Sequence, residues 1–179
     1  MKRRFAMQQT RRSFFQNVVS FFPLVVFFSL VAASSAVSGR YDNALRDIKG
    51  IKAVFDVSQG SPGMSNLIFW AVKNVYEDES TKSLPEKPQI AIVFHGPAVK
   101  LISNDRSSFA EKDFGELDKF HEMIRQLKKD GVKLEVCLYA AKVVGVDPAT
   151  ILPEIDRVGN GFISVIGYQA QGYSVVRVP

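Results

Sequence analysis

Short apolar runs alternate with amphipathic segments through most of the chain, and this alternation predicts its secondary structure. Five of the runs are rich in β-branched and aromatic residues and are bounded by turn-forming residues, which is typical of buried β-strands. These predicted strands occupy residues 51–57, 89–94, 132–138, 161–168 and 173–178.

The segments between these runs have the spacing of amphipathic helices. Apolar residues recur at helical intervals over residues 64–80 and again over 117–127, after which Gly131 provides a helix stop. An Asp-Pro pair opens a third predicted helix over residues 147–158. Shorter helical turns are expected at residues 98–102 and 140–144.

Strands that alternate with helices need crossover connections, and such connections produce a mainly parallel sheet with helices on both faces. After a polar lead-in at residues 39–50, we therefore expect residues 51–179 to form one α/β domain. The predicted architecture is a three-layer Rossmann-like fold whose sheet has about five strands.

The charge of the chain is concentrated at one end. The formal net charge is +5 over 179 residues, which would ordinarily favour a polyanionic partner. Residues 1–38 hold five basic side chains and no acid, so the remaining 18 basic residues balance the 18 acidic ones. We therefore expect no nucleic-acid partner for the body of the protein, and contact with a membrane only through residues 1–38.

Residues 1–38 have the order of an export signal: a basic stretch, an uncharged apolar stretch at residues 18–37, and small residues at its end. The run TRRSFF at residues 10–15 resembles the twin-arginine signal, although Gln16 stands where that pattern often has Lys. A general secretory signal and a retained anchor remain alternatives, because twenty apolar residues can span a bilayer. Each alternative predicts a periplasmic or otherwise exported body, anchored to the membrane if the segment is retained.

Three short sequences should meet at the carboxyl edge of the predicted sheet, where ligands bind in such folds. They are residues 58–66, 95–98 and 137–142. The first is rich in Gly and Ser and can be an ordinary tight turn, a small-anion site or an interface, but it matches no nucleotide-binding motif.

The chain has a single cysteine, Cys137, so no disulfide within the chain can form. At a strand end with a helix start beyond it, this thiol can be a nucleophilic thiolate or a buried hydrophobic residue. His95 can polarise or deprotonate such a thiol, or it can simply be hydrogen-bonded within its own turn. Asp56 can orient a neighbouring side chain or cap a turn. We expect His121 to be solvated. One cysteine and two histidines are too few for a four-ligand zinc site, so no metal or other cofactor is expected.

The segment LEVCLYAAKVVGV at residues 134–146 is similar to the cysteine segment of the DsrE/TusD sulfur-relay proteins, in the DsrE/DsrF-like family. The likeness continues in IVFHGPA at 92–98, LKKDGV at 127–132 and QGYSVV at 171–176. It implies a Rossmann-like subunit that assembles into homotrimers or homohexamers. It also implies a thiol, here Cys137, that accepts sulfane sulfur as a persulfide and passes it to a partner protein.

Two departures from the family pattern matter. The loop SQGSPGMSN at residues 58–66 does not reproduce the TGPxYG-like loop of the relay subunits, and the export signal argues against cytoplasmic tRNA thiolation. We therefore expect an exported sulfur carrier, or alternatively a non-catalytic oligomeric binding module; a thiol hydrolase lacks a convincing base and orienting carboxylate. The expected reactive residue is Cys137. The other expected site residues are Ser58, Gly60, His95, Gly96 and Tyr139.

Overall fold

The computed structural model describes residues 41–179, and the predicted leader at residues 1–38 lies outside them. Residues 41–50 form turns that lead into the first strand. No helix in this described part is long and apolar enough to cross a membrane.

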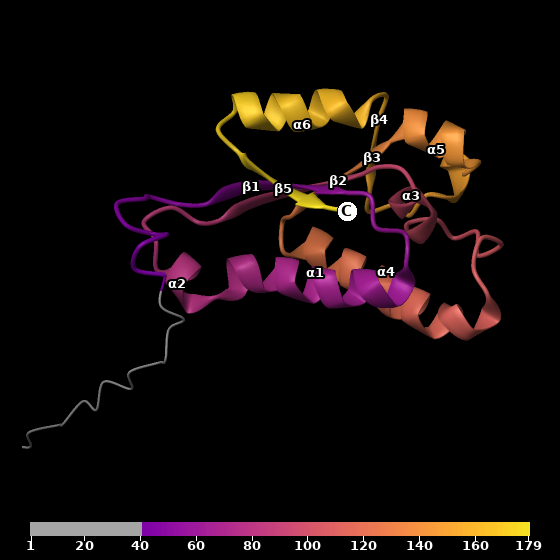
Figure 1. Cartoon of the computed structure of the whole chain (residues 1–179), viewed down its shortest axis with the longest axis horizontal. Coiled ribbons are helices and arrows are strands. Elements are labelled where there is room, and N and C mark those ends of the chain that lie inside the picture. The colour runs from indigo at the N-terminus through magenta and orange to yellow at the C-terminus, as the bar shows by residue number, and fades with distance from the viewer. Residues whose placement is uncertain (1–40) are drawn as a thin grey trace, which may run out of the picture. The chain divides into compact units, whose positions relative to one another are not determined.

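Five strands form one sheet in the spatial order β4-β3-β2-β1-β5, and every neighbouring pair is parallel. Figure 1 shows the sheet edge-on between two layers of helices. The expected α/β fold with a five-stranded sheet is therefore confirmed, and the sheet is entirely parallel. The strands are β1 (Lys52–Val57), β2 (Gln89–Phe94), β3 (Lys133–Cys137), β4 (Asp156–Val158) and β5 (Ser174–Val178).

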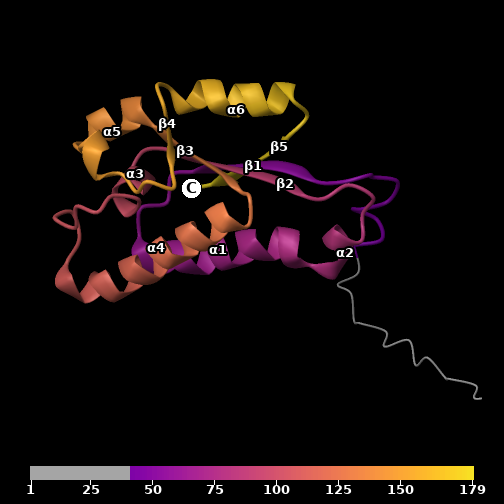
Figure 2. The same cartoon turned by 180° about the vertical axis from the view of Figure 1, so that it is seen from behind.

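The helices α1 (Pro62–Glu77) and α4 (Phe114–Lys129) cover one face of the sheet, and α5 (Leu138–Val144) and α6 (Gly161–Ala170) lie over the other (Figures 1 and 2). Right-handed crossovers account for α1, α4 and α6. The chain steps from β1 to β2 to β3 in one direction through α1 and α4, and its return past β1 to β5 places α6 on the opposite face. The step from β3 to the edge strand β4 continues in the first direction, with α5 on the α6 side. The shorter elements are α2 (Glu79–Lys82), α3 (Ala98–Leu101) and the 3₁₀ turns η1 (Glu111–Asp113) and η2 (Pro148–Thr150).

The predicted strand at residues 161–168 is wrong, because this segment is helix α6. The Asn160 side chain accepts the N–H of Phe162 and caps the helix. Val165 and Tyr168, three residues apart, face the sheet, while Ile163 on the outer side is exposed. A helix that is apolar on both its buried and its outer side gives the continuous apolar run that resembles a buried strand.

The predicted helix at residues 147–158 is also wrong. Asp147 does cap a helical start through the N–H of Ala149, but only one 3₁₀ turn follows, at Pro148–Thr150. The N–H of Leu152 bonds instead to the carbonyl of Ile102, and Pro153 next to it has no N–H to continue a helix. The chain then forms β4, which pairs with β3 as an edge strand.

Candidate functional site

Cys137 lies where β3 ends and α5 begins, at the carboxyl edge of the sheet. The residue is 3% exposed, and its Sγ accepts the backbone N–H of Ala140 over 3.3 Å. The chain leaves β2 toward α4 on one face of the sheet and leaves β3 toward α5 on the other (Figure 1). Cys137 therefore stands at a switch point, where parallel sheets usually bind their ligands.

His95 follows directly after β2, the strand next to β3. Its backbone N–H bonds to the carbonyl of Val57 over 2.8 Å and extends the β1–β2 pairing by one step. Gly96 then turns the chain with a φ of +45°, a backbone conformation that residues with a side chain rarely adopt. This turn fixes the imidazole at the edge of the sheet beside the end of β3.

Asp56 on β1 approaches the histidine ring. Its Oδ1 lies 3.1 Å from His95 Nε2, at ion-pair distance, although the ring N–H is not aligned for a full hydrogen bond. The parallel register pairs Asp56 with Val93, two residues before His95, so both side chains project from the same face of the sheet. The carboxylate is thus held against the imidazole by two adjacent strands.

Gly161, the first residue of α6, packs against both His95 and Cys137. A Cβ at this position would collide with His95 Cε1 and would lie 2.9 Å from Cys137 Cβ and 3.0 Å from His95 Nδ1. The Cys137 Cβ and the His95 Nδ1 are therefore no further apart than the sum of these two distances. Only glycine leaves room for the two side chains to share this space.

Phe162 covers the histidine from the outside. Its ring stacks on the His95 ring with centroids 5.1 Å apart and an angle of 24° between the planes. Burial lowers the pKa of His95 below its ordinary value, and the neighbouring Asp56 carboxylate offsets part of that change. The imidazole is therefore neutral near pH 7 and can act as a base.

The remaining predicted site residues lie along the same edge. The backbone N–H of Ser58 bonds to the carbonyl of Val178 over 2.8 Å, and its Cβ would be 3.9 Å from a Cβ on Gly96. Gly60 packs so closely on Pro97 that a Cβ there would lie 2.6 Å from the proline Cβ. Through these contacts Ser58 and Gly60 hold the loop after β1 against β5 and against Pro97.

Tyr139 is 68% exposed at the start of α5, and its backbone N–H donates to the carbonyl of Gly159. His121, which the sequence places on a solvated helix face, is instead buried, and its Nε2 is 2.8 Å from the carbonyl oxygen of Leu101. Its residue spacing on the helix, four residues after Leu117 and three before Ile124, is that of the buried stripe.

Sequence reasoning overlooked Gly161 and Phe162 as site residues, because residues 161–168 look like a strand. Asp56 carries a usable signal, since a carboxylate inside an otherwise apolar strand is unusual and needs a partner. The sequence alone does not identify His95 as this partner, because only the parallel register of β1 and β2 brings the two side chains together.

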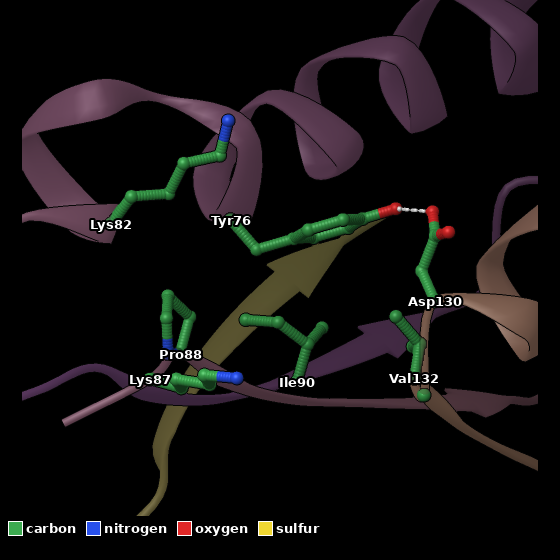
Figure 3. A pocket seen from close by; sticks show the side chains of 8 residues that line it. Tyr76, Lys82, Lys87, Pro88, Ile90, Asp130 and Val132 are labelled. Carbon is green, nitrogen blue, oxygen red and sulfur yellow. Dashed lines mark hydrogen bonds between the residues drawn. The ribbon is translucent and has the colours of Figure 1, made fainter. Parts of the chain in front are cut away.

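A separate cavity of about 320 Å³ opens at the opposite edge, where β2 and β3 begin (Figure 3). Ile90 and Val132 form its apolar floor, and the ring of Tyr76 forms a wall. The hydroxyl of Tyr76 donates to Asp130 over 2.7 Å, and burial together with this carboxylate raises the pKa of the phenol. This cavity has no part in the arrangement around Cys137.

The model of the DsrE/DsrF-like family matches residues 52–178, from the first strand to the last. The chain belongs to the DsrE/DsrF-like family. This family is known in general for sulfur relay. The matched residues include β1, β2 and β3, the three strands at whose carboxyl ends Asp56, His95 and Cys137 lie.

Solved structures are similar to this DsrE/DsrF-like chain. A protein of unknown function from Methanobacterium thermoautotrophicum, MTH1491, is similar with a TM-score of 0.55 and 20% identity, over 71% of this chain and 98% of that one. The ychN protein from E. coli has a TM-score of 0.48 and 13% identity over the same shares. No curated protein matches the sequence.

Proposed function

We propose that this protein carries sulfane sulfur as a persulfide on Cys137. The observation that supports the proposal most strongly is the convergence of the thiol with His95 and Gly161 at the carboxyl edge of a DsrE/DsrF-like sheet. Within residues 41–179 no other thiol competes with it.

The reaction needs a thiolate and a sulfane sulfur donor. The Cys137 thiolate attacks the outer sulfur of thiosulfate, a new S–S bond forms, the donor's S–S bond breaks, and sulfite leaves with the electron pair of that bond. A polysulfide reacts in the same way and leaves shorter by one sulfur. In both cases the product is Cys137–S–S⁻, and an acceptor thiol or protein removes its terminal sulfur by the reverse type of attack.

Two neighbours suit an anionic sulfur at this position. The N–H of Ala140 already points at Sγ, and hydrogen bonds from backbone N–H groups stabilise anions more than neutral groups. Neutral His95 lies near Cys137, with Gly161 packed against both side chains, and is the neighbouring base that would take the thiol proton. No step calls for a resident metal or organic cofactor.

The wider assignment is also part of this proposal. The twin-arginine-like leader supports export to the periplasm or a comparable compartment, cleaved or anchored. The apolar outer side of α6, with Phe162, Ile163 and Ile166 all more than 60% exposed, supports assembly into a homotrimer or homohexamer next to Cys137. A sulfur donor or acceptor protein would approach the same edge.

A second candidate is a non-catalytic oligomeric binding module in which Cys137 only fills the core. The burial of the residue, at 3% exposure, is the observation that favours it. The two candidates differ in thiol access. Rapid, complete labelling of the native protein by iodoacetamide supports the carrier, and labelling only after denaturation supports the binding module.

Intact-mass spectrometry tests the carrier directly. The full-length protein, reduced and then incubated with thiosulfate or polysulfide, should gain the mass of one sulfur atom and lose it again with dithiothreitol. The Cys137→Ser variant is the matched control and should gain nothing. An unchanged mass for the wild type, or equal gains for both proteins, would exclude the persulfide on Cys137.

A further inference from the structure

The two ring nitrogens of His95 face different neighbours. Nε2 is 3.1 Å from Asp56 Oδ1, on the β1 side. Nδ1 lies on the Gly161 side of the ring, 3.0 Å from the point that a Cβ on Gly161 would occupy, and Cys137 Cβ lies 2.9 Å from the same point. The imidazole therefore stands between a carboxylate and a thiol, which are the two groups that a proton relay needs.

We propose that Asp56 is a positioning residue that keeps the proton of neutral His95 on Nε2, so that Nδ1 is free to accept the proton of the Cys137 thiol. This inference rests on the proposed function only in naming the thiolate as the group that takes up sulfur. Cys137 and His95 are the reacting pair, and Asp56 acts through His95.

The physical reason lies in the choice between the two tautomers. With the proton on Nδ1, the lone pair of Nε2 would face the Asp56 oxygen at 3.1 Å, and two acceptors would repel each other. With the proton on Nε2, a donor nitrogen lies 3.1 Å from the carboxylate oxygen, which attracts its N–H even though the two are not aligned for a full hydrogen bond, and Nδ1 keeps its lone pair. The partner on one ring nitrogen thereby sets the state of the other.

The proton transfer balances without another reactant. The S–H bond of Cys137 breaks, an N–H bond forms at Nδ1, and the product is a thiolate beside an imidazolium. The Asp56 carboxylate then stabilises the imidazolium charge, as the opposing influences on the pKa of His95 already indicate. After the thiolate has attacked a donor, the same Nδ1 proton can pass to the leaving sulfur anion.

The charged groups around the pair do not replace Asp56. Among residues 41–179, Asp56 is the one charged group at ion-pair distance from His95. Arg177 on β5 is next to Asp56 in the strand register, Glu135 is two residues before Cys137 on the same strand face, and α6 carries no charged residue. Lys142 on α5 and Lys100 on α3 are the other charged groups of the helices beside the site, and Tyr139 on α5 and Tyr168 on α6 are their titratable phenols.

Glu135 supplies a matched control for the role of Asp56. It is a second carboxylate on the same face of the sheet, and its Oε1 accepts the hydroxyl of Tyr168 over 2.6 Å. It has no contact with His95 among the interactions of residues 41–179. Glu135→Gln therefore removes a nearby negative charge without touching the imidazole.

The test measures thiolate formation without any sulfur donor. The rate of Cys137 alkylation by iodoacetamide, followed against pH, should shift to higher pH in Asp56→Asn and fall about tenfold near neutrality, because a neighbouring opposite charge changes proton affinity by about one unit or more. Glu135→Gln should keep the wild-type profile. An unshifted profile in Asp56→Asn, or equal shifts in both variants, would overturn the proposal.

A second measurement does not depend on whether the variants fold. The ¹⁵N chemical shifts of the His95 ring in the wild-type protein report which nitrogen carries the proton, and we expect protonated Nε2 and bare Nδ1. The reverse assignment would overturn the proposal by itself. Because neither measurement uses a sulfur donor, Asp56 can be confirmed even if Cys137 forms no persulfide, and refuted even if it does.

Discussion

The two faces of the sheet are formed by alternate residues of the same strands, and they bury different chemistry. Toward α1 and α4 the strands present large apolar side chains, among them Phe55, Ile92 and Phe94. Phe69 of α1 stacks on Phe94 at 5.8 Å and meets Phe120 of α4 edge-on at 4.8 Å. This face is a continuous apolar core that gives the fold its stability.

The face toward α6 has a much smaller apolar cluster, centred on Val54, Ala91 and Val93. Toward the carboxyl edge the same strand positions turn polar and reactive, with Asp56 and then His95 and Cys137. The helix α6, which has no charged residue, packs on this cluster, and its first residue is the glycine that the site needs. Stability and reactivity are thus assigned to opposite faces, and variants should separate them.

The largest effect is expected on the apolar face. Phe69→Ala should lower the free energy of unfolding by about 3–5 kcal/mol, because the fully buried ring leaves a cavity between two aromatic neighbours. Urea denaturation of both proteins measures the difference. The iodoacetamide rate of folded Phe69→Ala should match the wild type, since the ring lies on the side of the sheet away from Cys137.

Phe162→Ala is the control for this prediction, because it removes the same side chain from the other face. Phe162 is 64% exposed and stacks on His95, so its loss should cost about 1 kcal/mol or less and should alter the iodoacetamide rate of Cys137. Equal losses of stability in Phe69→Ala and Phe162→Ala would show that the apolar face does not contribute more to stability than the face that carries Cys137.

An intermediate effect is expected at the first residue of α6. Gly161→Ala should lower the free energy of unfolding by about 1–3 kcal/mol, because the new methyl group must push His95 and Cys137 apart. It should also slow the alkylation of Cys137. Urea denaturation and the iodoacetamide rate measure the two consequences on the same sample.

Gly167→Ala controls for the general effect of replacing a glycine in this helix. A Cβ at Gly167 meets nothing within 4 Å, so alanine should raise the stability by about 0.5–1 kcal/mol through its helix propensity. The alkylation rate should stay unchanged. If alkylation of Cys137 slows in both variants, or in neither, the absence of a side chain at Gly161 is not a specific requirement of the site.

The apolar face could be predicted from the sequence almost completely, and the reactive face only in part. Runs such as residues 90–94 are apolar at every position because the sheet is covered on both sides, and this pattern needs no knowledge of neighbours. Cys137 and His95 could be chosen because each stands at a predicted strand end. Their proximity depends on β2 and β3 being adjacent, which the crossover rule favours but a local pattern does not contain.

Gly161 shows why the rest could not be predicted. Its value comes from two side chains that are far away in the sequence, and its own segment is too apolar for periodicity to distinguish a helix from a strand. The errors at residues 147–158 and 161–168 have different physical sources. The first segment follows its contacts with β3 and with Ile102 at the end of α3. The second is a helix whose outer side is also apolar, which hides its period. Local propensity is overridden where long-range contacts decide the outcome.

The last prediction compares one histidine from each face. His121 belongs to α4 and bonds to Leu101, while His95 belongs to the site, and burial lowers the pKa of both. The unfolded chain, with histidine pKa values near 6.5, then binds more protons below about pH 6.5 than the folded chain does. The free energy of unfolding should be constant near neutrality and fall as the pH drops below about 6.5, by at most about 1.4 kcal/mol per pH unit for each histidine.

Urea denaturation at several pH values between about 5 and 7.5 measures this slope. His121→Gln and His95→Gln should each remove one part of it, and the double variant should be nearly independent of pH in this window. The part due to His95 should increase in Asp56→Asn, because the carboxylate that offsets the effect of burial on its pKa is then absent. If the free energy of unfolding of the double variant still falls with pH as steeply as that of the wild type, carboxylates and not the two histidines cause the acid sensitivity.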